Sequence, residues 1–444
     1  MTLQAAPRPA STTRRVLDVA GRGLQAGGTS WMVAGSLIAG VGAYAFQVVA
    51  ARGLGDVAYA PISVLWTIQY LLLAVVLYSM ESYVTRAVVL GADDPARVRR
   101  AVRVLAAWIA ALAVALGGLT YAARDALFGG AGELSLAVAA IVLGYGAFVV
   151  VRGALAGRSR FKSYGAATAL ESLVRLAVAI AALLWVGTTD AVAWSLPAGA
   201  VGAASWWLVA RRAQGSRPAA VDSLPSGAGR PTRFLLLTTI ANGAAQALLA
   251  AGPLILVPLG ASPAAISVFF VTVTAARAPL VVVQGGVLSR VLPTFTRMAA
   301  RGDTASLGRV AVWIAAATAL LAAAGALLAA VAGPAVVALL FGEGFRPHWW
   351  LAAGAIGGVV LATGGMLLNQ MLIAEGREER LVAPWLLALA VAVVTLLLAA
   401  GDPVLRVTAG FVAGETVALA ALVVAIARTR RTTPQGRGNV PQMT

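Results

Sequence analysis

The sequence predicts an all-α protein that crosses a membrane about twelve times, and three observations carry this prediction. Of the 444 residues, 60% are hydrophobic and only 11% are charged, whereas soluble domains average roughly a quarter charged. Stretches of about 20 apolar residues, the length that crosses a hydrocarbon core, recur along the whole chain. Basic residues cluster in alternate connections between these stretches. Together these features exclude a soluble globular fold.

The apolar stretches define the expected spans. They lie near residues 31–51, 61–83, 104–122, 134–151, 165–187, 190–210, 234–258, 264–288, 310–333, 350–374, 382–400 and 404–427. An even number of spans puts both termini on one side of the membrane. With that side taken as cytoplasmic, it holds 28 of the 34 basic residues, which is the distribution that the positive-inside rule describes. The net charge of +17 therefore predicts contact with anionic lipid, not with nucleic acid.

Polar segments divide the chain into five parts. Residues 213–232 are rich in Pro, Gly and Ser and are predicted to be a cytoplasmic linker between an N-terminal six-helix lobe (31–212) and a C-terminal six-helix lobe (233–428). Residues 1–30 are expected to be a cytoplasmic segment, in which residues 11–28 are compatible with a short amphipathic helix on the membrane surface. Residues 429–444 are expected to be a disordered cytoplasmic tail.

The two halves repeat three short motifs in the same order, which indicates an internal duplication. With six spans in each half, the repeats share one orientation and are related by an axis along the membrane normal, a common transporter plan. The pairs are Leu54-Gly55 with Leu259-Gly260, Leu127-Phe128-Gly129 with Leu340-Phe341-Gly342, and Leu155-Ala156-Gly157-Arg158 with Ile373-Ala374-Glu375-Gly376-Arg377.

Polar residues inside the spans are the candidates for function, because a charge in the hydrocarbon core costs roughly 2.5 to 3.5 kcal/mol on insertion scales unless it has a partner or water. Arg277 and Gln284 share one face of the eighth span, and Asn242 and Gln246 share one face of the seventh. These two polar faces are predicted to line a central cavity and bind the substrate. The alternative is that they form hydrogen bonds between packed helices. Pro279 is a candidate hinge beside Arg277.

Glu171 with Arg175, and Glu415, each have two possible roles, one structural and one functional. Glu171 and Arg175, four residues apart in the fifth span, either neutralise each other as an ion pair or serve the cavity, with Arg175 on an anionic substrate and Glu171 as a proton acceptor. Glu415 in the twelfth span has no basic neighbour on its own helix, so it is either a coupling site or has a structural partner elsewhere. Glu81 and Arg86 are five residues apart and are not expected to pair.

Several residue types that other functions need are missing from the sequence. There are no cysteines and one histidine, which excludes thiol nucleophiles and argues against a metal site. The chain lacks a GxxxxGK[ST] motif and long connections on the outer side, so no ATPase and no enzyme activity is expected. No cofactor is predicted, although H⁺ or Na⁺ is a candidate coupling ion.

Four junctions of the chain resemble those of the bacterial polysaccharide flippases, the Wzx-like transporters. The first looks like their AR-x-LG-x-x-x-Y/F-G junction, with Ala60 in place of the last glycine, and the others look like their fourth-to-fifth span motif, their eighth span and their LLFG junction. These are, in order, Ala51-Arg52-Gly53-Leu54-Gly55-Asp56-Val57-Ala58-Tyr59; Arg152-Gly153-Ala154-Leu155-Ala156-Gly157 with Arg160-Phe161 and Tyr164; Ala276-Arg277-Ala278-Pro279-Leu280 with Leu292-Pro293; and Leu340-Phe341-Gly342.

The resemblance implies membership of the multidrug/oligosaccharidyl-lipid/polysaccharide exporter superfamily, with two MATE/MurJ-like six-helix lobes around a cavity that opens to each side in turn. It implies a flippase that moves an isoprenoid-diphosphate-linked oligosaccharide outward across the bacterial cytoplasmic membrane for surface polysaccharide assembly, beside a polymerase and glycosyltransferases. MurJ-like relatives usually have fourteen spans, and drug exporters tend to carry acidic sites in spans one and seven, which this chain lacks. The alternatives are a cation-coupled multidrug exporter and a non-transporting scaffold for glycan assembly.

Overall fold

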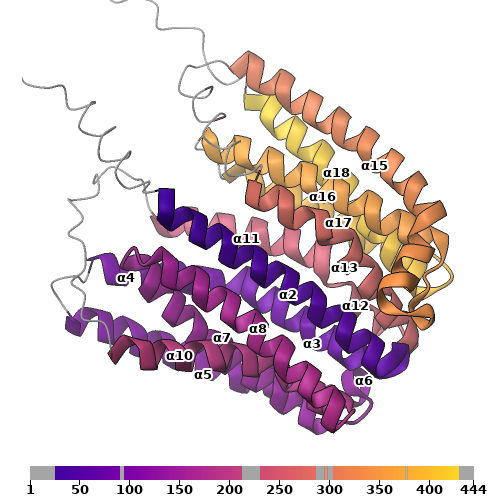
Figure 1. The fold of residues 1–444 in the computed structure, drawn as a ribbon. Coiled ribbons are helices and arrows are strands. Elements are labelled where there is room, and N and C mark those ends of the chain that lie inside the picture. Colours follow the sequence, from indigo (N-terminus) through magenta and orange to yellow (C-terminus); the bar gives the residue numbers. More distant parts are fainter. Residues whose placement is uncertain are drawn as a thin grey trace, which may run out of the picture.

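The computed structural model is a bundle of long helices (Figure 1). It describes residues 26–90, 95–212, 231–286, 304–375 and 379–429, together with Phe295, Met298 and Arg377. No strand occurs among these residues. The expected N-terminal segment, linker and C-terminal tail lie almost wholly outside the described residues, so their predicted roles stay predictions.

The first six expected spans each coincide with helical structure. They are α2 (Ala26–Ala58); a second span made of α3 (Ala60–Leu71), the π-helical turn η1 (Leu72–Leu77) and α4 (Tyr78–Leu90); then α5 (Pro95–Ala122), α7 (Gly132–Gly157), α8 (Phe161–Trp185) and α10 (Ser195–Arg212). Two short helices, α6 (Arg124–Phe128) and α9 (Thr189–Ala193), connect them. Gly129, at φ 62°, ends α6 in the left-handed conformation.

The last six spans follow the same plan. They are α11 (Pro231–Ala250), α13 (Pro263–Gly286), α15 (Thr304–Phe341), α16 (Trp349–Ala374), α17 (Glu379–Leu398) and α18 (Pro403–Thr429), with the short α12 (Gly252–Leu256) and the 3₁₀ turn η2 (Glu343–Phe345) between them. Among the described residues, nine helices are long and apolar enough to cross a membrane. The chain is therefore a multi-pass membrane protein with twelve helical spans in two lobes.

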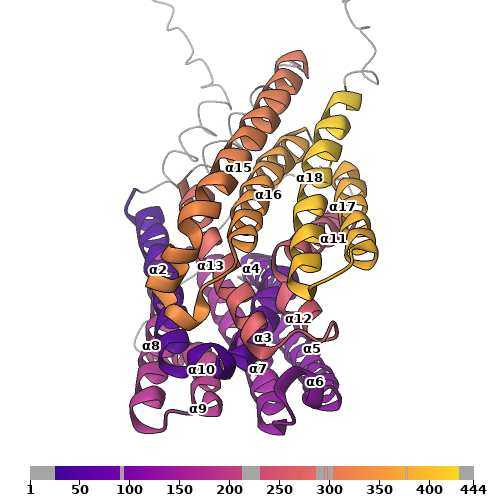
Figure 2. The ribbon, with the colours of Figure 1, turned by 90° about the vertical axis from the view of Figure 1, so that its right-hand side faces the viewer.

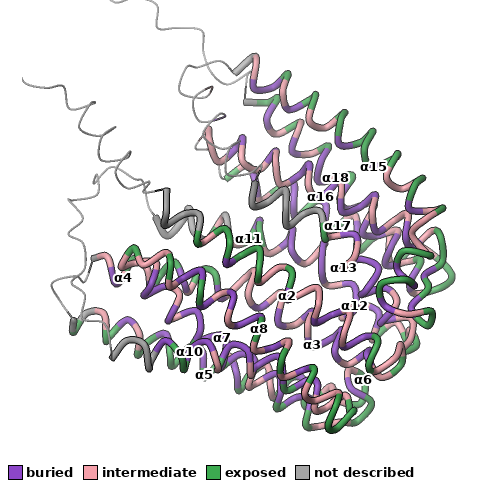
Figure 3. The backbone as a smooth tube through the Cα atoms, viewed as in Figure 1, coloured by how far each residue is buried: buried purple, intermediate pink, exposed green. Residues whose placement is uncertain are grey.

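Each lobe is packed in the same way, as the repeated motifs predict. In the N-terminal lobe α2 packs on α8, α5 and α4 on α7, and α7 and α8 on α10. The C-terminal lobe repeats these contacts: α11 packs on α17, α15 and α13 on α16, and α16 and α17 on α18. In the central helices α7 and α16, 67% and 61% of the residues in their most apolar 18-residue stretch are buried, the largest shares among the nine membrane-crossing helices of the described residues. Figure 3 shows buried residues gathered where helices face each other.

The two lobes meet through the first two spans of each half. Helices α2 and α3 and the turn η1 contact α11, α12 and α13, and these elements lie between the lobes in Figures 1 and 2. At the end where α2 stops, Arg52 donates hydrogen bonds to the carbonyls of Leu339 and Leu340. There the ring of Tyr59 also packs against Phe270 and Phe345. The N-terminal lobe is thereby tied to α13, α15 and η2.

The tightest helix contact in the N-terminal lobe depends on a pair of glycines, and this gives a test of the packing. A Cβ atom on Gly165 of α8 would lie 2.2 Å from the carbonyl oxygen of Trp31 in α2, and one on Gly35 would lie 2.2 Å from the carbonyl oxygen of Gly165. We predict that Gly165→Val lowers the melting temperature of the detergent-purified protein, because overpacking costs about 1–3 kcal/mol.

Gly118→Ala in α5 is the matched control, because a Cβ there meets nothing within 4 Å. This variant should melt within a degree or two of the parent protein. Equal melting temperatures for Gly165→Val and the parent would contradict the close approach of α2 and α8.

Candidate anion site between the lobes

Arg277 lies on α13 where the two lobes meet. Its guanidinium carbon is 4.4 Å from the centre of the Tyr70 ring, which belongs to α3 of the other lobe. Within the described part of the chain, no carboxylate forms an ion pair with Arg277. A guanidinium stacked on a ring is stabilised by the ring's negative face and keeps its in-plane N–H donors free for an anion. Arg277 is therefore a half-buried cation whose counter-charge is not supplied by the described residues.

The pocket around Arg277 draws on both lobes, and none of its described lining residues is acidic. It encloses about 10 Å³, which is room for about one water molecule. Among the described residues that line it, only Arg277 is charged, and four aromatic rings make up much of the rest. The lining residues are Trp66, Thr67, Tyr70, Leu249, Ala250, Pro253, Phe269, Phe270, Val273, Thr274 and Arg277.

The polar residues of the seventh span also lie at this interface, where they bond to the other lobe. Gln246 accepts a hydrogen bond of 2.8 Å from the hydroxyl of Tyr70. Asn242 donates one of 3.0 Å to the carbonyl of Ala74, which belongs to η1, and π-helical turns are frequent at functional sites. Both contacts are hydrogen bonds between packed helices, which was the alternative to substrate binding. A role of Asn242 and Gln246 in substrate binding stays a prediction.

Two candidates on α13 have side chains outside the described residues. The backbone places Gln284 and Pro279 within α13, as the sequence predicts. Their roles in substrate binding and as a hinge are therefore not tested by the structure.

Glu171 and Arg175 form an ion pair inside the N-terminal lobe. The Arg175 Nη1 to Glu171 Oε1 distance is 2.7 Å, and Arg175 and Glu171 are only 4% and 6% exposed. The hydroxyl of Tyr145 donates to Glu171 at 2.5 Å and accepts from Arg175 and from Gln69, each at 2.8 Å. This is the geometry of the self-neutralising alternative. A contact of Arg175 with substrate and a proton at Glu171 stay predictions.

Trp66 links this ion pair to the Arg277 pocket. The guanidinium of Arg175 lies 4.8 Å from the centre of the Trp66 ring, and Trp66 also lines the pocket around Arg277. The ring of Phe46 stacks on Trp66 with centroids 5.2 Å apart. The buried ion pair therefore positions one aromatic wall of the Arg277 pocket.

A second ionic cluster was not predicted from the sequence. Arg152 Nη2 lies 3.2 Å from Glu81 Oε2, and Tyr164 donates to Glu81 at 2.8 Å and accepts from Arg152. The separation of 71 positions between Glu81 and Arg152 hides the pair from any rule based on spacing along one helix. A signal did exist, because Arg152 and Tyr164 both belong to the motif that resembles the flippase fourth-to-fifth span junction.

Glu415 is buried in the C-terminal lobe and has no hydrogen-bond partner among the described residues. It is 1% exposed, and neither carboxylate oxygen has a hydrogen-bond partner. On the same α18, Phe411 lies against Gly358 and Leu422 near Gly365, both in α16. Glu415 falls between them on that face, so it points toward α16. Its role as a coupling site stays a prediction.

Comparison with known proteins identifies the fold. No family model matches the chain. Two uncharacterized proteins of Mycobacterium tuberculosis are 28% identical over 307 residues, which cover 67% of this chain and 66% of theirs, just under two thirds. An inward-facing MATE transporter of the MOP superfamily matches with a TM-score of 0.62 at 16% identity, over 89% of this chain and 96% of that one. The fold is that of the MATE transporters.

Two further structures extend the likeness. An outward-facing MATE transporter matches with a TM-score of 0.56 at 16% identity, over 91% of this chain and 96% of that one. A MOP superfamily transporter from Pyrococcus furiosus, whose binding pocket is described as having reverse polarity, matches with a TM-score of 0.55 at 16% identity, over 91% and 94%. The MATE transporters have twelve helices in two lobes, the arrangement that the described helices of this chain follow.

The buried ion pair gives a testable difference between a structural and a substrate-binding role. We predict that Glu171→Gln lowers the melting temperature strongly, because an unpaired buried arginine costs about 3–5 kcal/mol. Glu171→Gln combined with Arg175→Gln should recover part of that loss, since no uncompensated charge remains. If Glu171→Gln melts like the parent protein while its substrate binding falls, the pair serves the substrate and not the fold.

Proposed function

We propose that the protein is a secondary transporter that moves an isoprenoid-diphosphate-linked oligosaccharide from the cytoplasmic to the outer leaflet of a bacterial membrane, for surface polysaccharide assembly. One observation carries the proposal: Arg277 is held between the lobes on the ring of Tyr70, and no carboxylate pairs with it in the described part. Both termini would lie in the cytoplasm, and the polymerase and glycosyltransferases of the same assembly would be partners.

The chemistry of a diphosphate suits such a cation. An anion that leaves water needs a partner that stays charged in a dry site, and the guanidinium of arginine does not lose its proton in proteins. Its planar N–H donors also form paired, charge-assisted hydrogen bonds with phosphate oxygens. The sugar part would be held by hydrogen-bonding groups of the same interface, with Asn242, Gln246 and Gln284 as the candidates.

Alternating access explains why the Arg277 pocket is small. A space of about 10 Å³ admits no sugar, so the lobes must separate to receive one. Arg52 and Tyr59 tie the lobes together at the end where α2 stops, which the positive-inside rule makes the outer end. The larger TM-score with the inward-facing neighbour, 0.62 against 0.56, supports assigning this arrangement to a state closed on the outside.

A cation-coupled multidrug exporter is the second candidate. Two neighbours are multidrug resistance transporters, and the aromatic lining of the Arg277 pocket suits flat, apolar molecules. The charge of Arg277 favours an anion over a cationic drug, because like charges repel strongly where water is scarce. The neighbour from Pyrococcus furiosus, described as having reverse pocket polarity that suggests a different function, supports variation of pocket charge on this fold.

Glu415 is our candidate for energy coupling. A carboxylate buried without a partner is costly when charged, so it favours binding H⁺ or Na⁺ whenever the alternating cycle gives it access to either side. Glu171 is the weaker candidate because Arg175 already neutralises it.

The anion site is tested by transport in proteoliposomes. A fluorescent isoprenoid-diphosphate-linked sugar should be flipped by the wild-type protein, and Arg277→Gln should lower the initial rate at least tenfold, because hydrogen bonds to charged groups contribute about 1.5–3 kcal/mol. Arg277→Lys should retain an intermediate rate, and the surface variant Arg103→Gln should match the wild type. A cationic dye transported faster than the anionic lipid, with no loss in Arg277→Gln, would favour the multidrug candidate.

Alternating access is tested by locking the outer contact. The chain has no cysteine, and a Cβ on Gly344 of η2 would lie 3.8 Å from the Cβ of Asp56 in α2, which is within the range for a disulfide. We predict that Asp56→Cys combined with Gly344→Cys crosslinks on oxidation and stops flipping. Reduction should restore it, and each single variant should be indifferent to oxidation. Transport at the wild-type rate by the crosslinked protein would contradict opening at this end.

A further inference from the structure

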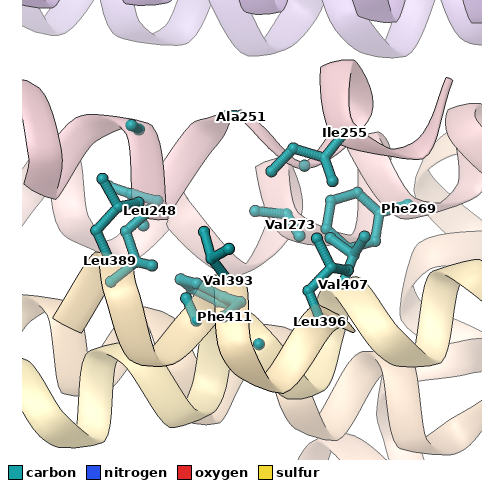
Figure 4. A pocket seen from close by; sticks show the side chains of 15 residues that line it. Leu248, Ala251, Ile255, Phe269, Val273, Leu389, Val393, Leu396, Val407 and Phe411 are labelled. Carbon is teal, nitrogen blue, oxygen red and sulfur yellow. The ribbon is translucent and has the colours of Figure 1, made fainter. Parts of the chain in front are cut away.

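An apolar slot runs through the C-terminal lobe beside the Arg277 pocket. It encloses about 140 Å³ between α11–α12 on one side and α17–α18 on the other, with α13 behind (Figure 4). Every described residue that lines it is apolar. Those residues are Ala247, Leu248, Leu249, Ala251, Gly252, Ile255, Phe269, Val273, Leu389, Ala392, Val393, Leu396, Val407, Gly410 and Phe411.

The inner end of the slot meets the Arg277 pocket. Leu249, Phe269 and Val273 line both spaces. The ring of Phe269, one of these shared residues, is in close contact with Gly252, where an added Cβ would come within 2.1 Å of the ring. Gly252 therefore leaves room for the Phe269 ring at the place where the slot and the Arg277 pocket adjoin. An apolar chain in the slot would therefore end beside the pocket that Arg277 lines.

The outer end of the slot faces the surrounding membrane. Val393 of α17 lines the slot and is 45% exposed. Its neighbour Val394 is 52% exposed but does not line the slot. Val393 is therefore at the edge of α17 where the slot and the lipid-facing surface meet, and Val394 is on the lipid-facing surface alone. A chain entering past Val393 would reach the Arg277 pocket without crossing a polar group.

We propose that this slot binds the first isoprene unit of the lipid carrier while Arg277 binds the diphosphate attached to it. The proposal rests on the proposed function and names the form of its substrate-binding site. An apolar cavity of about 150 Å³ is large enough to bind benzene, so a slot of about 140 Å³ fits one branched five-carbon unit. The remaining units of the chain lie in the membrane beyond Val393.

An apolar slot with a cation at its inner end fits an isoprenoid diphosphate better than it fits a phospholipid. A diphosphate joined directly to a branched hydrocarbon chain places its charge next to its first isoprene unit, which matches an apolar space that adjoins the Arg277 pocket and shares three lining residues with it. In a phospholipid, a glycerol and two ester groups stand between the phosphate and the chains. Polar groups placed inside the slot would meet no donor among its described lining side chains, and such burial is unfavourable.

The test uses a farnesyl diphosphate probe with a photoreactive diazirine on its first isoprene unit, added to the whole protein in lipid nanodiscs. After illumination, mass spectrometry should locate the label on the slot segments of α17 and α18, between Leu389 and Phe411. Val393→Trp, which fills the slot, should lower this labelling at least fivefold. The matched control Val394→Trp, on the lipid side of the same helix, should leave it unchanged. Leu396→Trp is a second slot-filling variant, and melting temperatures show that each variant is folded.

Each further outcome separates the possible errors. Arg277→Gln should reduce labelling by the diphosphate probe at least fivefold. A farnesol probe, which lacks the diphosphate, should label the wild-type slot no more than the diphosphate probe labels Arg277→Gln. Equal labelling of Val393→Trp and Val394→Trp, with loss in Arg277→Gln, would overturn the slot while leaving the proposed function intact. Displacement of the probe by phosphatidylglycerol would assign the slot to ordinary acyl chains. If excess unlabelled isoprenoid diphosphate removes none of the labelling of the wild-type protein, or if that protein is not labelled at all, the proposed function itself is overturned.

Discussion

A guanidinium charge inside a bilayer must be neutralised, and this requirement organises the structure around its two mid-membrane arginines. Arg175 is neutralised within the protein by Glu171 at 2.7 Å, and it donates a hydrogen bond of 2.8 Å to the hydroxyl of Tyr145. Arg277 has the ring of Tyr70 at 4.4 Å and no described carboxylate. The paired arginine stiffens one lobe, and the other is left to bind an anion from outside. Trp66 contacts Arg175 and lines the pocket of Arg277, so the buried pair also positions a wall of the anion site.

The fold was readable from the sequence because hydrophobic length and charge position are strong, local signals. Twelve apolar stretches gave twelve helical spans, and the motif pairs anticipated the repeated packing of the two lobes. The partners of the charges were not readable in the same way. Glu171 and Arg175 are four residues apart, so one helix brings them together, whereas Glu81 and Arg152 come from different helices. Only the packing of α4 on α7 creates that contact.

The polar residues of the site could be predicted from the sequence, but its aromatic and apolar residues could not. Arg277, Asn242 and Gln246 were found because polar groups are rare in apolar spans, and the structure brings all three to the surface between the lobes. The aromatic partner Tyr70 escaped notice because an aromatic ring in a span carries no such signal. The apolar slot beside Phe269 was equally invisible, since its lining cannot be told from core in a sequence of this hydrophobicity.

The measurement that tests the account most directly is mass spectrometry of the lipids from cells depleted of this protein. The account predicts that a lipid-linked oligosaccharide accumulates while the matching surface glycan falls, and that the wild-type gene restores both levels but a gene carrying Arg277→Gln does not. Unchanged lipid-linked oligosaccharides and intact surface glycan, in a strain without a second flippase for the same lipid, would contradict it.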